Sequence, residues 1–220
     1  FQQSGSTAMS AVDDVMPTAY DASWDVLGHG ATATTKTAGQ ADKEGAIGGF
    51  TTNNNFFYNA PELVEGLGVN LSYTPSGGST RPDGSVSFAL AYTGVEGLTL
   101  GYAQGENNAT AGSETDNDTM YIKYAFGPLT VGVQESEIDA STAAASDEFS
   151  AAGITYQVND DLTIGYTESA YNAGDKGVDH ESTNISFSYT MGSMTLAAGF
   201  AEEENRGGET TAANDISGYA

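Results

Sequence analysis

Large apolar residues alternate with small or polar residues along most of this chain, and one such alternating segment returns every 31 to 33 residues. It starts at Leu67, Leu98, Leu129, Leu162 and Met194. A period of two predicts β-strands with one apolar face and one small or polar face. A fixed spacing of this size indicates a repeated supersecondary unit. Because each unit holds a second strand of the same kind, we expect a series of β-hairpins.

The pattern predicts eleven strands joined alternately by short turns and by long polar loops. The expected strands are 54–60, 67–74, 85–93, 98–103, 119–126, 129–135, 149–158, 162–168, 183–191, 194–201 and one that opens at Ile216. The short connections are rich in Gly, Pro, Asn and Asp, as tight hairpin turns require. Short turns at one end and long loops at the other are typical of a transmembrane β-barrel, whose short turns face the periplasm.

Alternation alone fits two architectures, a soluble sandwich with its apolar face inward and a membrane barrel with its apolar face toward lipid. Three features favour the barrel. The polar face is made of small Ser, Thr, Gly and Ala, and the up-and-down order persists through all the strands. In addition, aromatic residues precede the short turns and predict an interfacial girdle. These residues are Tyr58, Tyr92, Tyr124, Tyr156 and Tyr189.

One observation opposes this interpretation, because the apolar face ends early on two strands. Glu135 follows Val133 and Glu168 follows Tyr166 in the same phase. Seven tilted strand residues span only about 16 Å of membrane, whereas the expected apolar band is about 25 Å tall. Either a β-bulge shifts the phase of these strands, or these positions lie against a neighbouring subunit.

The charge of the chain narrows the range of partners. It has 30 acidic and 6 basic residues, a formal net charge of −24, and no cysteine. So acidic a chain is repelled by nucleic acid and attracts cations. The absence of cysteine excludes disulfides, thiolate metal sites and a cysteine nucleophile. The chain contains no run of about 18 apolar residues, which is the length that a transmembrane helix needs, so no transmembrane helix is predicted.

The first fifty residues show no hairpin period and hold Asp13, Asp14, Asp21 and Asp25. So long a segment without strands is uncommon in a compact domain unless it is functional. Folded into the lumen of a barrel, the four aspartates would form an acidic ring that favours cations. The alternative is a solvated external loop.

The run Asn54-Asn55-Phe56-Phe57-Tyr58-Asn59-Ala60-Pro61, with Gly66-Leu67-Gly68 after it, resembles the segment with which general bacterial porins leave their constriction loop. These porins are trimeric, sixteen-stranded diffusion channels of the Gram-negative outer membrane. The resemblance implies an all-β, antiparallel, up-and-down transmembrane barrel of about sixteen strands with an inward-folded loop. Residues 1–53 would form the constriction region, Tyr20 included, and 54–220 the barrel wall. About five N-terminal strands and the end of the last strand would then be missing.

The resemblance also implies the function, which is passive diffusion of small hydrophilic solutes and ions. Family members often carry Arg on the wall opposite the loop, whereas Phe57 stands at one such position here and Lys123 is the only basic residue at an inward strand position. We therefore expect cation preference. Expected partners are two further copies in a homotrimer, outer-membrane lipid, lipopolysaccharide and small solutes, and no nucleic acid.

No arrangement of residues indicates an enzyme. His180 and Glu181 are expected to be solvated in a loop. No cofactor is expected apart from Ca²⁺, which could bridge loop carboxylates such as Glu202, Glu203 and Glu204 to neighbouring subunits or to lipopolysaccharide. An alternative function from another class is a secreted, acidic, calcium-stabilised β-rich surface or adhesion protein. Such a protein would be soluble without detergent and would not conduct ions.

Overall fold

The computed structural model describes residues 7–13, 15–23, 54–77, 83–108, 114–140, 146–174, 177–206, 208, 210 and 215–219. In this part of the chain, eleven antiparallel strands form one sheet in the order of the sequence. They are β1 (Phe56–Asn59), β2 (Leu67–Thr74), β3 (Ser85–Val95), β4 (Leu98–Asn107), β5 (Thr115–Phe126), β6 (Leu129–Ala140), β7 (Asp147–Gln157), β8 (Leu162–Ala173), β9 (His180–Met191), β10 (Met194–Glu204) and β11 (Ile216–Tyr219). The expected strands and their up-and-down order are therefore confirmed.

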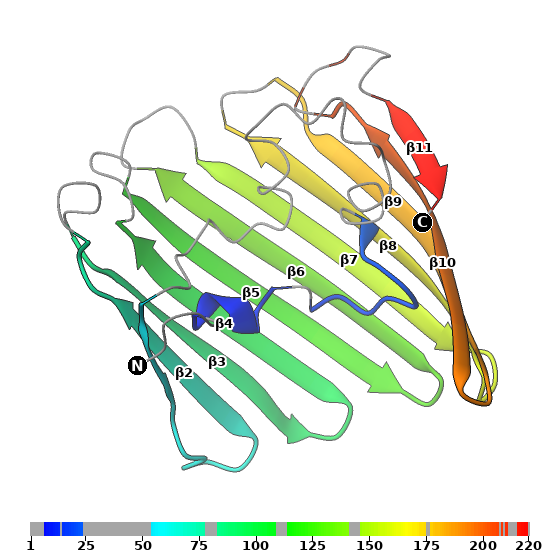
Figure 1. The fold of residues 1–220 in the computed structure, drawn as a ribbon, viewed down its shortest axis with the longest axis horizontal. Helices are drawn as coiled ribbons and strands as arrows, with labels where there is room; N and C mark the ends of the chain where they lie inside the picture. Colours follow the sequence, from blue (N-terminus) through cyan, green and yellow to red (C-terminus); the bar gives the residue numbers. More distant parts are fainter. Residues whose placement is uncertain are drawn as a thin grey trace.

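The sheet is curved, and the N-terminal segment crosses its concave side (Figure 1). This segment, residues 7–13 and 15–23, contains one 3-10 turn, η1 (Met9–Ala11). We call the face on which it lies the inner face and the opposite face the outer face. No helix within the described residues is both long and apolar enough to cross a membrane.

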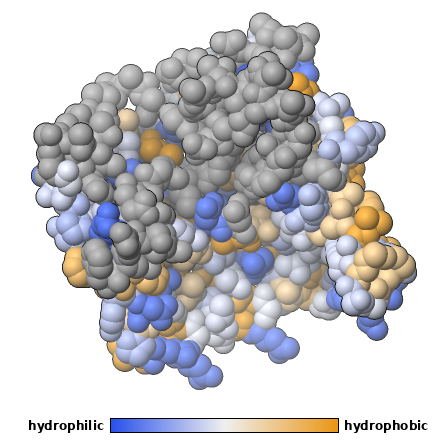
Figure 2. Space-filling model, in the orientation of Figure 1, coloured by the Kyte–Doolittle hydropathy of each residue, from blue (hydrophilic) through white to orange (hydrophobic). Residues whose placement is uncertain are grey.

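The residues of the short turns allow the chain to reverse direction at one end of the sheet. Gly66, Gly97, Gly127 and Gly192 adopt positive φ in four of the short turns. This conformation has a low energy in glycine because glycine has no Cβ. In the turn between β7 and β8, the Asn159 side-chain oxygen instead accepts hydrogen bonds from the backbone N–H groups of Asp161 and Leu162, at 2.9 and 3.0 Å. In Figure 2, hydrophilic residues are visible along the lower edge of the molecule, where short turns lie.

The strands continue further toward the long loops than the hydrophobic pattern indicated. β5 begins at Thr115 instead of 119, and β6 ends at Ala140 instead of 135. In these extensions the outer face is acidic, whereas the backbone pairing between β5 and β6 continues without a shift. The apolar pattern stops there, but the hydrogen-bonded ladder does not depend on it.

The proposed β-bulge near the early acidic residues is wrong. β6 pairs with β7, and β8 with β9, in continuous register through Glu135 and Glu168, and both side chains are exposed on the outer face. Among the described strands, the register shifts only between β3 and β4, at Tyr92 and Val95. The outer face is therefore apolar near the short turns and acidic near the long loops.

Rows of paired residues cross this boundary obliquely. One row begins at Leu71 and Phe88 on β2 and β3 and ends at Asp118, Glu137 and Glu148 on β5, β6 and β7. A row lies perpendicular to its strands, so in a barrel with tilted strands it climbs from one level of the membrane to another. The apolar band therefore follows a plane oblique to the strands, as a lipid-facing belt does.

Candidate functional site

The segment of residues 7–13 and 15–23 is attached to the inner face across most of the width of the sheet. Side chains of β2, β5, β6 and β9 hold its backbone by hydrogen bonds. Ser72 accepts from Ala8 N–H at 3.1 Å, Gln134 Nε2 donates to Val12 O at 3.1 Å, Lys123 Nζ donates to Val15 O at 3.4 Å, and Asn184 Nδ2 donates to Asp21 O at 2.7 Å. Because these contacts go to the backbone, they fix the path of the segment whatever side chains it carries.

Apolar side chains of the segment complete its attachment. Met9, Val12 and Met16 are buried at 1%, 1% and 5% exposure. They belong to a cluster to which the sheet contributes Ala89, Ala103, Tyr121, Phe149 and Ala151. The small inner-face residues therefore make room for a packed segment. Their alternation predicted only a small or polar face, because the segment that packs on them lies far away along the chain.

The predicted acidic constriction residues lie partly on this segment. Asp13 is exposed, Asp21 is partly exposed, and Tyr20 is 41% exposed. Asp14 and Asp25 lie outside the described residues. The two described aspartates thus remain accessible from the inner side while the backbone beside them is fixed to the sheet. Their role in setting ion preference stays a prediction.

The two predicted wall residues occupy the inner face on different strands. Phe57 of β1 pairs with the inward Ser72, and Lys123 of β5 pairs with the inward Gly132. The Lys123 ammonium group donates to the segment carbonyl of Val15, so this cation lies beside the segment. The wall and the segment are therefore one connected site on the inner face.

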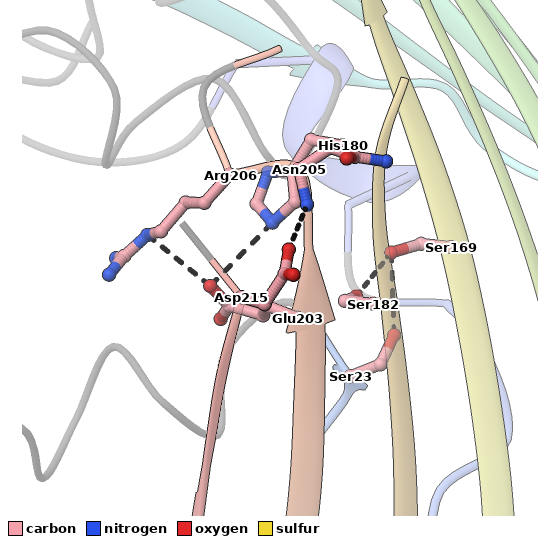
Figure 3. A network of polar contacts seen from close by, with 8 residues as sticks. All are labelled: Ser23, Ser169, His180, Ser182, Glu203, Asn205, Arg206 and Asp215. Carbon is pink, nitrogen blue, oxygen red and sulfur yellow. Dashed lines mark hydrogen bonds and ion pairs between the residues drawn. The ribbon is translucent and has the colours of Figure 1, made fainter. Parts of the chain in front are cut away.

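A charged cluster on the inner face was not predicted. Glu203 is 2% exposed, and its Oε2 lies 3.3 Å from Arg206 Nε and 3.6 Å from His180 Nε2 (Figure 3). A buried carboxylate is costly unless it is paired, and Arg206 supplies the opposite charge. His180 begins β9 and is 5% exposed, so the expectation of a solvated loop histidine is wrong. The polar alternation His180, Ser182, Asn184 was the signal that could have placed it on the inner face.

Serine side chains connect the end of the segment to the same region. The Ser23 hydroxyl donates to Ser169 Oγ at 3.4 Å, and Ser169 and Ser182 share a hydrogen bond of 2.7 Å (Figure 3). Asn205 N–H donates to the Asp215 carboxylate at 3.1 Å and joins the two ends of the connection between β10 and β11. Hydrogen bonds between serine side chains thus connect the segment to β8 and β9.

The five girdle tyrosines all lie on the outer face near the short turns. Four of them, Tyr58, Tyr124, Tyr156 and Tyr189, are 36% to 55% exposed, and Tyr92 is half-buried. Their placement at a membrane interface stays a prediction.

The opposite edge of the apolar band carries tyrosines that sequence analysis missed. The Tyr102 hydroxyl donates to Asp118 at 2.7 Å, and the Tyr166 hydroxyl donates to Glu168 at 2.9 Å. Each is an outward aromatic whose polar end contacts the first acidic residues, an arrangement that suits the boundary between an apolar and a polar medium.

The three glutamates considered for calcium do not converge. Glu203 points inward and is buried, whereas Glu202 and Glu204 are exposed on the outer face. Strand alternation causes this separation. Among the described residues, no group of three or more His, Cys, Asp or Glu side chains could hold a metal ion. These three residues therefore do not form one site, and calcium that bridges carboxylates such as Glu202 and Glu204 to a neighbouring subunit or to lipopolysaccharide stays a prediction.

A family model described as "Gram-negative porin" matches residues 4–208 of the chain. Among curated protein sequences, no relative matches. The match of the family model includes the segment on the inner face and ten of the eleven described strands.

Several solved structures have a fold similar to that of this chain. An anion-selective porin from Comamonas acidovorans matches with 15% identity and a TM-score of 0.57 over 69% of this chain and 49% of its own. A second porin structure matches with 15% identity and a TM-score of 0.59 over 78% and 64%. OmpT of Vibrio cholerae matches with 17% identity and a TM-score of 0.51 over 76% and 62%. The chain therefore spans less than two thirds of the length of each of these proteins.

Proposed function

Because the chain belongs to the Gram-negative porin family of the outer membrane, we propose that it forms much of the wall and the inward segment of a passive diffusion channel. The observation that carries this proposal is the segment of residues 7–13 and 15–23, which is held on the face of the sheet that carries small residues by Ser72, Lys123, Gln134 and Asn184. A segment held in this way narrows the lumen of a barrel without closing it. The solutes are small hydrophilic molecules and ions, selected by size.

The arrangement of the two faces supports a membrane setting. Large apolar side chains such as Ile185, Met120 and Leu196 are 65%, 57% and 56% exposed on the outer face. Water disfavours so extensive an apolar surface, which in soluble proteins is rare beyond a few hundred Å². Lipid around the outer face removes that cost. The sheet is open at β1 and β11, and further strands would close it in a complete barrel.

Acidic charge at the inward segment gives the proposed channel a preference for cations. Asp13 and Asp21 lie on the segment with their side chains at least partly exposed, and the sequence adds Asp14 and Asp25. Negative side chains at a narrow point raise the local concentration of cations and repel anions. The two described basic side chains, Lys123 and Arg206, lie next to the Val15 carbonyl and the Glu203 carboxylate. We also propose that the protein works as a homotrimer.

The test is the reversal potential of single channels in a planar bilayer under a salt gradient. Replacing Asp13, Asp14, Asp21 and Asp25 by Asn should move the reversal potential toward zero or toward anion preference. The matched control replaces four exposed carboxylates at the short turns by their amides. These are Glu65, Glu96, Asp160 and Asp161. The control removes the same net charge and should leave the selectivity close to that of the wild type.

Two results would contradict the proposal at different levels. Equal reversal potentials in the aspartate variant and the control would refute the acidic constriction while leaving the channel intact. A wild-type protein that gives no conductance steps and stays soluble without detergent would refute the channel itself. That second result would support the acidic surface or adhesion protein instead.

A further inference from the structure

Three glycines lie directly beneath the middle of the inward segment. A Cβ on Gly132 of β6 would lie 2.7 Å from Pro17 Cδ, and a Cβ on Gly153 of β7 would lie 2.8 Å from Pro17 O. On Gly165 of β8, a Cβ would lie 2.9 Å from Ala19 N. Distances this short are well inside van der Waals contact. Any side chain at these positions would therefore push the segment away from the wall.

The strand backbone does not itself require these glycines. None of the three has the positive φ that distinguishes the turn glycines. Glycine in the interior of a strand weakens the strand and often marks the close approach of another backbone. Gly132 and Gly153 are directly paired across β6 and β7, and Gly165 lies on the next strand, β8, where it pairs with Thr155. We call these three positions the glycine furrow.

We propose that Gly132, Gly153 and Gly165 are positioning residues, whose missing side chains set how far residues 16–19 project into the lumen. This inference rests on the proposed channel function and deepens it. The pore cross-section at the segment then depends on the wall beneath it as well as on the segment's own side chains.

The attachments on either side show why the furrow controls this stretch. Lys123 holds Val15 O before it, and Asn184 holds Asp21 O after it. Between these two hydrogen bonds, Pro17 has no N–H to donate, and its ring fixes φ. The backbone at Pro17 therefore cannot rotate about φ to avoid a side chain added beneath it. Its depth is set by contact with the furrow.

Gly132→Ala gives the sharpest test, because its added methyl group meets one close atom. Besides Pro17 Cδ at 2.7 Å, the next atoms, Met16 Cε and Sδ, lie at 3.4 Å. Adding Pro17→Ala removes Cδ and with it the clash. Gly68→Ala on β2 is the matched control, since its Cβ would meet only Ala91 O, at 3.7 Å.

The measurements are single-channel conductance and the uptake of neutral sugars of increasing size into vesicles that contain the full-length protein. Gly132→Ala should lose about a quarter to a half of the conductance and discriminate more steeply against larger sugars, because pore width governs both. The double variant Gly132→Ala/Pro17→Ala should recover most of the loss. Gly68→Ala should behave as the wild type does.

Each outcome separates the furrow from the channel function. Gly132→Ala with the conductance and sugar discrimination of Gly68→Ala overturns the furrow proposal, as does a loss that Pro17→Ala fails to rescue. A wild type without conductance steps overturns the proposed function instead. Thermal unfolding of each variant gives an independent readout, because a purely structural role would change stability without the selective effect on larger sugars.

Discussion

The outer and inner faces of the same strands differ in which side chains are exposed and which are buried. The outer face near the short turns exposes large apolar side chains, such as Met120 and Ile185. The inner face carries small or polar side chains, yet Ser87, Thr119 and Asn184 are 6%, 1% and 1% exposed. A soluble sandwich buries its large residues in a dry core. Here the segment of residues 7–13 and 15–23 buries part of the inner face. The large apolar side chains lie on the outer face, which suits contact with lipid instead of water.

The two halves of the outer face sharpen this comparison. On β6, Val131 and Val133 lie toward the turn, and Glu135, Glu137 and Asp139 follow in the same phase toward the loop. An acidic side chain in hydrocarbon is strongly disfavoured. The change therefore marks the level at which the surroundings of the outer face become polar.

The largest effect should come from a charge placed in the apolar half of the outer face. Phe187→Arg should destabilise the folded protein in vesicles by about 2–4 kcal/mol, the cost of arginine on the lipid face of a barrel. Ser188→Arg on the inner face of the same strand should cost much less. Unfolding by denaturant in lipid vesicles measures both values, and equal losses would mean that the two faces have been assigned the wrong surroundings.

An intermediate effect should follow from loosening the inward segment. Asn184→Ala removes the 2.7 Å hydrogen bond to Asp21 O and should weaken the attachment by about 1–2 kcal/mol. The wall should stay folded while the segment becomes more sensitive to limited proteolysis. Asn70→Ala, which removes an exposed side-chain contact with Asn59, is the control. Equal cleavage in both variants would show that this anchor does not hold the segment.

The smallest effect should come from the edge between the apolar and acidic halves. Tyr102→Phe removes one exposed hydrogen bond to Asp118 and should cost about 0.5–1 kcal/mol. Tyr124→Phe should cost less still, because the ring of Tyr124 stacks on Phe126 at 5.7 Å and that contact survives. The difference in denaturation midpoint in vesicles measures it, and a larger loss at Tyr124 would reverse the order that we expect.

Local patterns were sufficient for the strands and turns but not for their full length. β2, Leu67–Thr74, has the predicted bounds because its apolar alternation runs to its end. β5 was predicted too short, since Asp116 and Asp118 interrupt the apolar face while the ladder continues. His180 was assigned to a loop for the same reason. Hydrophobic periodicity reports the environment of a face, and backbone pairing extends beyond it.

The alternation and the turn residues can be read along the chain, and they are sufficient for the order of eleven strands with two unlike faces. The segment that covers the inner face is held there by contacts between residues remote in sequence, which the folded structure brings together. Gln134 and Asn184 donate hydrogen bonds to backbone carbonyls 122 and 163 residues away. The three glycines of the furrow can be explained only by the segment that packs on them, which includes Pro17. Contacts over such separations leave no periodic signal, because they depend on how the folded sheet presents residues that are remote along the chain.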